Sequence, residues 1–473
     1  MLLQLPDYCL LSVLQFCADD PHSLFSAARA HSRLQQAAVL AASSISVLLQ
    51  QQEQADSVVL YLTNHGQHVS SISILLMPSG PTISMRQLPP NLRKLATLQL
   101  RGVHVQLQPG DGFAGVLHAG MPLKQLQFDT CRLLDGEEGL AAALSLLPSL
   151  QHLSTGPLLH LDSVHNVRLP SNFAQLLPQL TYLDLTACGR FQNCDSLHGL
   201  TNLQDLRLRL LPTASISAST FYGSEQLTRL ELHGQVAADM LSSSCFEAAL
   251  LAGRTQLQHL ELKLCVVLGR TAGVTELLSH LQHMQQLTRL CLTRSMRDVA
   301  SAAAYSALIA SSKLQHLDIS NSKLPEGVWQ HVIPPGRQLL HLQSLNIMSD
   351  INVGAAGPLA APEGSTLVSC CPGLRYLWMP YLKYSEGQVD ALTGLSALQH
   401  LCVRPANHSF AGMGAVCQLT GLTLLRLSDN VNGGDNSRLL WQLTQLRQLE
   451  YLHYAGYING QLGTKLWRVE VSR

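Results

Sequence analysis

Leucines recur along most of this chain in one pattern, L-x-x-L-x-L, with occasional conservative substitutions. Fourteen copies follow one another, and their first leucines run from Leu95 to Leu449 at a mean spacing of about 27 residues. A weaker copy, with Val69, Ile72 and Ile74, lies upstream. So many copies in one phase do not arise by chance, and the pattern therefore predicts a protein built from stacked repeats.

Each copy predicts a short strand. The second half of the motif alternates apolar and variable positions, so its leucines share one face of an extended segment. Strands of successive copies would join one parallel sheet at a spacing of about 4.8 Å. The return path after each strand must cover the leucines. This arrangement is typical of leucine-rich repeats.

Several return segments have helical periodicity. Segment 271–285 (TAGVTELLSHLQHMQ) places apolar residues from Val274 to Met284 on one helical face. Segments 245–253 and 298–311 are similar. Strands on one side and wider helices on the other would curve the stack. The predicted fold class is therefore α/β, a leucine-rich-repeat solenoid shaped like a horseshoe.

Small polar residues follow the third apolar position of several copies by three residues. Such a side chain can bond backbone groups where the strand turns away, because buried amides need partners. We expect this role for Cys131, Cys188, Cys265, Ser295, Ser322 and Asn430.

The first 45 residues do not fit the repeat and predict three short helices. Apolar residues follow helical spacing from Leu10 to Cys17, and Asp20-Pro21 is a helix-start signal. A unit this small buries little apolar surface, so it needs support from the next domain or from a partner chain.

This N-terminal segment resembles an F-box over residues 3–42. The resemblance is carried by Leu5-Pro6-Asp7, Val13-Leu14, Phe16, Leu24-Phe25 and Ser32-Arg33-Leu34. The remainder resembles the ribonuclease-inhibitor-like, cysteine-containing repeats that often follow F-boxes. The resemblance implies an all-helical N-terminal unit that docks on a Skp-type adaptor of a cullin ubiquitin ligase, with the repeats holding a protein substrate.

The same resemblance supplies candidate adaptor contacts, and each has an alternative. Carried over by position, the contacts are Leu5, Pro6, Leu14, Phe16 and Leu24. Alternatively, some of them, above all Leu14 and Leu24, fill the core of the three-helix unit.

The predicted organisation has three parts. Residues 1–45 form the F-box-like unit, 46–68 a linking and capping helix that ends near Gly66, and 69–473 a repeat domain of about 14–15 repeats.

Side chains between the strand leucines would point onto the concave face of the horseshoe. Aromatic residues and Arg are enriched at the energetic centres of interfaces, and Trp378 would be such an anchor. The alternatives are that the alternating charges satisfy one another across strands and that Trp378 packs against its neighbours. The predicted partner-binding residues are Arg207, Arg209, Arg229, Glu231, Glu261, Arg289, Tyr376, Trp378, His400 and Arg404.

Charge and hydropathy limit the class of partner. Lys and Arg together number 31, as do Asp and Glu, so the chain lacks the basic excess of a nucleic-acid-binding protein. No apolar run reaches the roughly 18 residues of a membrane span, and the N-terminus lacks signal-peptide features. We expect a protein of the cytoplasm, or the nucleus, with reduced thiols, monomeric outside its complex.

Catalytic and cofactor motifs are missing from the sequence. There is no phosphate-binding loop, no G-x-S-x-G, no H-E-x-x-H and no paired C-x-x-C. His152, His259, His316 and His400 recur in phase with the repeat rather than at metal-ligand spacing. We expect no enzyme activity, no cofactor and no metal.

The predicted function is therefore substrate recognition for a cullin-type ubiquitin ligase. One alternative is a repeat scaffold without a role in ubiquitin transfer. A weaker one is a regulator of a small GTPase, which the absence of an acidic tail disfavours.

Overall fold

The computed structural model describes most of the chain from residue 43 to Arg468 and, before that, only Leu14, Ser32 and Leu34. The chain divides into two compact units: unit 1 comprises 1–214 with 219–227, and unit 2 comprises 215–218 with 228–473. Beyond residue 43, the description omits 77–82, 86–87, 106–115, 119, 130, 134–141, 156–165, 168–171, 187–189, 192–193, 195–196, 211–213, 235–243, 349–361, 385, 406–412, 429–442, 444–445, 459–460 and 469–473.

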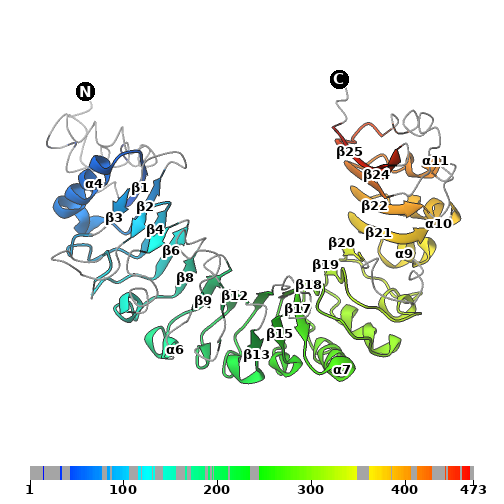
Figure 1. Cartoon of the computed structure of the whole chain (residues 1–473), viewed down its shortest axis with the longest axis horizontal. Coiled ribbons are helices and arrows are strands. Elements are labelled where there is room, and N and C mark those ends of the chain that lie inside the picture. The colour runs from blue at the N-terminus through cyan, green and yellow to red at the C-terminus, as the bar shows by residue number, and fades with distance from the viewer. Residues whose placement is uncertain are drawn as a thin grey trace. The chain divides into compact units, whose positions relative to one another are not determined.

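Unit 1 contains a parallel ladder in which each strand pairs with that of the next repeat (Figure 1). Its strands are β1 (Ser44–Leu49), β2 (Ser71–Leu76), β4 (Thr97–Arg101), β6 (Gln125–Asp129), β8 (His152–Thr155), β10 (Tyr182–Leu185) and β12 (Asp205–Arg209).

Unit 2 continues the same plan and ends differently. Eight successive pairings are parallel, and the last strand turns back antiparallel to its neighbour. The strands are β14 (Arg229–His233), β16 (His259–Lys263), β18 (Arg289–Cys291), β19 (His316–Asp318), β20 (Ser344–Asn346), β21 (Tyr376–Tyr384), β22 (His400–Pro405), β23 (Leu424–Ser428), β24 (Tyr451–Ile458) and β25 (Gln461–Arg468). A terminal hairpin was not predicted.

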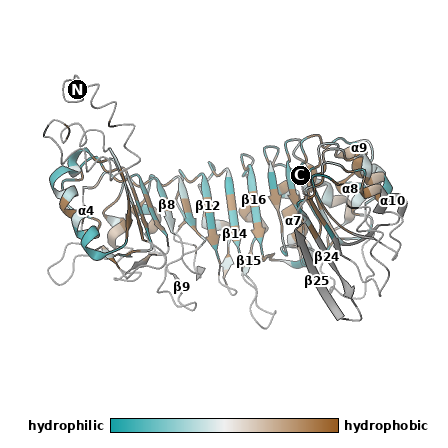
Figure 2. Cartoon of the chain, turned by 90° about the horizontal axis from the view of Figure 1, so that it is seen from above, coloured by the Kyte–Doolittle hydropathy of each residue, from teal (hydrophilic) through white to brown (hydrophobic). Residues whose placement is uncertain are grey.

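The repeated leucines form the core of both ladders, as predicted. Every side chain of the fourteen sets that the structure describes is at most 4% exposed. Equivalent leucines pair across strands, for example Leu98 with Leu126 and Leu260 with Leu290. Burying each such side chain contributes about 1.5–3 kcal/mol. Hydrophilic and hydrophobic residues alternate along β14 and β16 (Figure 2).

One of the three predicted return helices is an α-helix and two are not. Helix α7 (Arg270–Leu281) buries Val274, Leu277, Leu278 and Leu281, which confirms the predicted apolar face. Segment 298–311 instead holds a 3₁₀ helix, η6 (Ala302–Ile309), and segment 245–253 holds β15 (Ser244–Phe246) followed by η5 (Ala248–Leu251). A 3₁₀ helix rises about 2.0 Å per residue against 1.5 Å in an α-helix, so a short return covers the distance with fewer residues.

The other returns are short elements. In unit 2, α7, α9 and α10 lie along one side of the strand ladder (Figure 1). Minor parallel sheets join β3 (Ser84–Met85), β5 (His104–Val105) and β7 (Arg132–Leu133); β9 (Asn166–Val167) and β11 (Arg190–Phe191); and β13 (Ser215–Ile216), β15 and β17 (Cys265–Val267). The remaining helices are α6 (Phe173–Leu176), η4 (Ala218–Phe221), α8 (Trp329–Val332), α9 (Gly364–Cys370), α10 (Glu386–Ala391), η7 (Leu392–Gly394) and α11 (Met413–Val416).

The repeat sheet begins earlier than predicted. We expected 46–68 to be a linking helix, but β1 occupies the start of that segment and pairs in register with β2. Only the second part is helical, in α4 (Gln52–His65) and η2 (Gly66–His68). The copy escaped notice because Ala42 stands where the first leucine of the motif belongs.

The small polar residues after the strands have the predicted role. Cys131 Sγ donates to the carbonyl of Leu100 at 3.1 Å and Cys265 Sγ to that of Leu232 at 3.3 Å. Ser295 and Ser322 donate equivalently to the carbonyls of Leu262 and Leu292, at 2.6 and 2.9 Å. Each buried side chain thus ties one repeat to the preceding one. The other two predicted positions, Cys188 and Asn430, lie outside the described residues.

Candidate protein-binding face

The outward side chains of the repeat strands form a surface that we call the strand face. In unit 2 the strand pairing aligns them in rows. The first row contains Arg229, His259, Arg289, His316, Ser344, Tyr376, His400, Leu424 and Tyr451. The second row contains Glu231, Glu261, Cys291, Asp318, Asn346, Trp378, Cys402 and Arg426.

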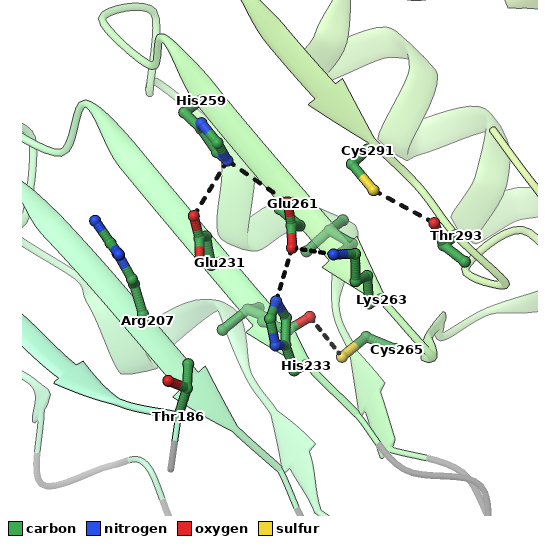
Figure 3. A network of polar contacts seen from close by, with 12 residues as sticks. Thr186, Arg207, Glu231, His233, His259, Glu261, Lys263, Cys265, Cys291 and Thr293 are labelled. Carbon is green, nitrogen blue, oxygen red and sulfur yellow. Dashed lines mark hydrogen bonds and ion pairs between the residues drawn. The ribbon is translucent and has the colours of Figure 1, made fainter. Parts of the chain in front are cut away.

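At the start of these rows lies a charged cluster, which consists of Arg229, Glu231, His233, His259, Glu261, Lys263 and Arg289. Glu231 accepts hydrogen bonds from the Arg229 guanidinium, with its Oε1 2.8 Å from Arg229 Nε. The same oxygen lies 3.2 Å from His259 Nε2. His259 therefore stands between the two carboxylates, because its Nε2 is also 3.7 Å from Glu261 Oε2 (Figure 3).

Glu261 is the centre of the charged cluster. Its Oε1 lies 2.6 Å from Lys263 Nζ and 2.8 Å from His233 Nε2 (Figure 3). Its Oε2 is 3.6 Å from Arg289 Nη2. Cationic or protonatable groups on three strands thus converge on one carboxylate, which is only 6% exposed.

The pKa shifts follow from this arrangement. Burial alone raises the pKa of Glu231, but contacts with His259 and Arg229 outweigh burial and lower it to about 2. Burial also raises the pKa of Glu261, but contacts with His233, His259 and Lys263 outweigh burial and hold that pKa well below its ordinary value. Burial lowers the pKa of His259, but its contacts with the two carboxylates outweigh burial and raise it. Both acids are therefore ionised at neutral pH.

The anionic and cationic side chains of the charged cluster differ in solvent exposure. The Glu231 and Glu261 side chains are 10% and 6% exposed, whereas those of Lys263 and Arg289 are 41% and 42% exposed. The carboxylates form the floor and the cations reach solvent. A molecule that approaches the charged cluster therefore meets positive charge first.

Three ligand atoms of Glu231, His233 and Glu261 lie within 4.8 Å of one another, a spacing compatible with a metal ion. However, Glu261 already contacts Lys263, and Glu231 already contacts Arg229. A divalent ion would have to displace the Lys263 ammonium beside a guanidinium. The electrostatics of these residues therefore disfavour a metal.

At the other end of the rows lies an aromatic patch, which consists of Tyr376, Trp378, His400, Leu424, Arg426 and Tyr451. The Tyr376 ring packs edge-on against His400 with centroids 4.5 Å apart. The Arg426 guanidinium lies over the Trp378 ring at 5.3 Å, spanning the buried Cys402 between them. Tyr376 and Tyr451 remain 37% and 42% exposed.

Unit 1 carries a smaller cluster of its own. The rings of His152 and Tyr182 stack with centroids 3.8 Å apart, and the Arg207 guanidinium lies 5.2 Å from the Tyr182 ring. Arg207 also bonds Asp205 with both Nε and Nη2, at 3.1 and 2.9 Å, and lies 3.8 Å from Asp184. These groups largely satisfy one another.

The predicted partner-binding residues therefore separate into groups. Arg229, Glu231, Glu261 and Arg289 come together in the charged cluster. Tyr376, Trp378 and His400 come together in the aromatic patch. Arg207 belongs to the cluster of unit 1, Arg209 is exposed at the end of β12, and the Arg404 side chain lies outside the described residues.

The predicted adaptor contacts mostly lie outside the described residues, as is the case for Leu5, Pro6, Phe16 and Leu24. Leu14 is described. It is helical and only 5% exposed, which agrees with the alternative that it fills a core.

Six members of these groups were not among the predicted partner-binding residues: His233, His259, Lys263, Leu424, Arg426 and Tyr451. His259 was interpreted as a consequence of repeat phase, yet it lies between two carboxylates. Leu424 and Tyr451 were overlooked, although they occupy the same first-row register as Tyr376. Extending that register through the last repeats would have found them.

No cysteine in the described part of the chain belongs to the charged cluster or to the aromatic patch. Of the nine free cysteines in the described part of the chain, eight are buried. Burial raises the pKa of Cys291 to about 11 and that of Cys371 to about 12. These thiols are therefore protonated at neutral pH and poor nucleophiles.

The chain is similar to several solved structures. No family model matches the chain, and no curated protein matches it. Among solved structures, a leucine-rich-repeat protein of Leptospira interrogans is 15% identical, with 87% of this chain and 89% of that chain covered and a TM-score of 0.48. An internalin of Listeria monocytogenes is 14% identical, with 87% and 95% covered and a TM-score of 0.44.

A third similar structure, of the Toll–Spätzle complex of Drosophila, is 15% identical, with 84% of this chain and 45% of that chain covered and a TM-score of 0.38. The leucine-rich-repeat fold itself is evident from the buried leucines and their strand register. No helix in the described part of the chain has the length and hydrophobicity needed to cross a membrane.

Proposed function

We propose that this protein is a non-catalytic binding protein that holds a protein partner on the strand face of unit 2. The observation that carries the proposal is the aromatic patch, where Tyr376 and Tyr451 stay more than a third exposed beside the half-buried Trp378 and Leu424. Large aromatic side chains and Arg dominate binding energy in protein interfaces.

The chemistry of the strand face favours binding over catalysis. The carboxylates of the charged cluster have lowered pKa values and the Cys291 thiol has a raised one. A general base works best with a pKa near the working pH, and a nucleophilic thiol needs a lowered pKa. Neither the two carboxylates nor the Cys291 thiol meets these conditions.

We further propose that the partner is the substrate of a cullin-type ubiquitin ligase, with the chain as its substrate receptor. This finer assignment rests on the F-box resemblance of residues 3–42, in which Leu5 and Pro6 are the leading candidates for adaptor contact. A repeat scaffold without a ubiquitin role is the alternative. Regulation of a small GTPase is the weaker alternative.

Two sets of variants of the full chain test these proposals separately. Trp378→Ala with Tyr376→Ala should abolish capture of a partner and leave adaptor binding unchanged. Leu5→Ala with Pro6→Ala should abolish binding to a Skp-type adaptor and leave partner capture unchanged. Tyr222→Ala is the matched control, because Tyr222 is 73% exposed outside the repeat strands.

The outcomes separate the alternatives. If the wild-type chain binds no Skp-type adaptor, the ligase assignment is wrong and the scaffold remains. If capture by the Trp378→Ala/Tyr376→Ala variant equals that by the wild type, the aromatic patch is not the binding site.

A further inference from the structure

The charged cluster and the aromatic patch share one row of the same unit. Arg289 on β18 and Tyr376 on β21 occupy equivalent first-row positions, separated by β19 and β20. Three strand spacings amount to about 14 Å. An extended peptide covers that distance with about four residues. One short segment can therefore reach both groups at once.

The intervening strands are compatible with such a segment. Their first-row side chains are His316 and Ser344, which are both half-buried and small or planar. Burial, together with Arg289 and His259 nearby, lowers the pKa of His316, so this ring is neutral at neutral pH. No exposed charge of this row therefore separates the two groups.

The charge that the charged cluster presents to solvent is positive, although its formal charges nearly balance. Glu231 and Glu261 lie on the floor, and their contacts fix the cations that reach solvent. The Arg289 guanidinium is held less tightly than Lys263, since its Nη2 lies 3.6 Å from Glu261 Oε2, whereas Lys263 Nζ lies 2.6 Å from Glu261 Oε1. Its forked N–H donors suit a carboxylate.

We propose that unit 2 binds an extended acidic segment of its partner, with carboxylates over Lys263 and Arg289 and, about four residues away, a large apolar or aromatic side chain against Tyr376. This inference rests on the proposed binding function and specifies its ligand. The buried carboxylates act as positioning groups, because they hold the cations in place before the ligand arrives. Preorganised cations lose less side-chain entropy when they bind.

A phosphate-bearing ligand such as RNA is the competing occupant of a cationic surface. It fits less well, because the Arg426 guanidinium covers one face of the Trp378 ring. Bases stack on open aromatic faces. The chain also carries no basic excess.

The test is selection of a random peptide display library on the full-length protein, with parallel selections on single variants. The expected result is enrichment of peptides in which an acidic residue precedes or follows an aromatic or large apolar residue by about four positions. Arg289→Glu should remove the acidic preference, and Tyr376→Ala should remove the aromatic one. Arg101→Glu and Tyr222→Ala are the controls, since both residues are exposed in unit 1.

The selected peptides, labelled with fluorescein, then report affinity by anisotropy. We expect Arg289→Glu and Tyr376→Ala each to weaken binding by about tenfold or more, the controls to leave it unchanged, and added salt to weaken binding. Selection without acidic enrichment, no selected binder, or equal affinity for Arg289→Glu and wild type would overturn the inference. A labelled RNA oligonucleotide that binds more tightly than the peptides would also overturn it.

Failure of this inference can be distinguished from failure of the proposed function. If capture of an intact partner still depends on Trp378 while selected peptides show no acidic preference, the binding function stands and the ligand assignment is wrong. If neither depends on the aromatic patch, both are wrong.

Discussion

The charged cluster and the aromatic patch lie in the same two rows of unit 2 but on different repeats, and the exposure of their side chains differs. In the charged cluster, groups from three strands contact one another and the carboxylates are removed from solvent. In the aromatic patch, the Tyr376 and Tyr451 rings stay exposed. The leucines beneath are the same in both. The comparison teaches that the outward residues of each strand decide whether the side chains of a region contact one another or remain open to solvent.

The largest expected effect is on stability and comes from the charged cluster. Glu261→Ala should lower the free energy of unfolding by about 2–3 kcal/mol, because the charge-assisted contacts of this carboxylate with Lys263 and the facing histidines are lost. Chemical denaturation measures the change. Asp129→Ala removes an exposed ion pair with Arg101 and should cost at most about 1 kcal/mol. Equal losses in the two variants would show that the charged cluster has no special role.

The pH dependence of stability should also come from the charged cluster. The pKa of Glu231 is lowered to about 2 when folded, so its stabilising contribution is complete above the ordinary value of 4.5 and is lost as pH falls towards 2. The loss should be on the order of 2–3 kcal/mol. Unfolding curves recorded across this range should show it, and Glu231→Gln should not. A variant with the same pH profile as the wild type would contradict the assignment.

His259 should give a pH dependence of opposite sign. Its pKa is raised in the folded protein, so its contribution is complete below the ordinary value of 6.5 and is lost as pH rises through the raised value. NMR titration of the His259 ring, compared between wild type and Glu231→Gln, measures the shift. A titration at or below the ordinary value would contradict the proposed bridge between the carboxylates.

Substitutions in the aromatic patch should affect partner binding more than stability. Trp378→Ala should weaken partner binding by about 2 kcal/mol, which is roughly thirtyfold, because exposed aromatic anchors carry much of an interface's energy. Its effect on the free energy of unfolding should be smaller than that of Glu261→Ala. Calorimetry with a selected peptide measures the first quantity and denaturation the second. A large loss of stability without loss of binding would reverse the comparison.

The smallest expected effect concerns the scaffold shared by both regions. Ser295→Ala should cost about 1–2 kcal/mol of stability, because the carbonyl of Leu262 loses its buried donor. Ser295→Cys should cost less, since Cys265 makes the same bond one repeat earlier. Denaturation of the two variants side by side checks this. Equal losses would show that volume matters there rather than the hydrogen bond.

The repeat could be predicted from the sequence because its signal is local. The spacing of the leucines predicted the strands, their buried face and the helix α7. The small polar residues three positions after the last leucine of a copy predicted the hydrogen bonds of Cys131 and Ser295. β1 was missed because one leucine of its motif is replaced by Ala42, and the antiparallel β25 follows no repeat. Short returns such as η6 carry too few residues for their helix type to be decided.

The candidate site was predictable only residue by residue. The register placed Glu231, Glu261 and Trp378 outward, but contacts such as those of Glu261 with His233 and of Trp378 with Arg426 join residues of different repeats, and no local pattern encodes them. Which charges are buried depends on side-chain lengths across three strands. The depth difference between the Glu261 carboxylate and the Arg289 guanidinium therefore required the structure. The F-box resemblance is still a prediction.

Position-specific photo-crosslinking tests the central claim most directly. The full chain would carry a photo-crosslinking amino acid in place of either Tyr376 or Tyr222, and one identified partner would be measured against both. We predict that the partner crosslinks at position 376 and not at 222, and that Arg289→Glu reduces the yield. Equal crosslinking at the two positions, or crosslinking at 222 alone, would show that the strand face of unit 2 is not the binding surface.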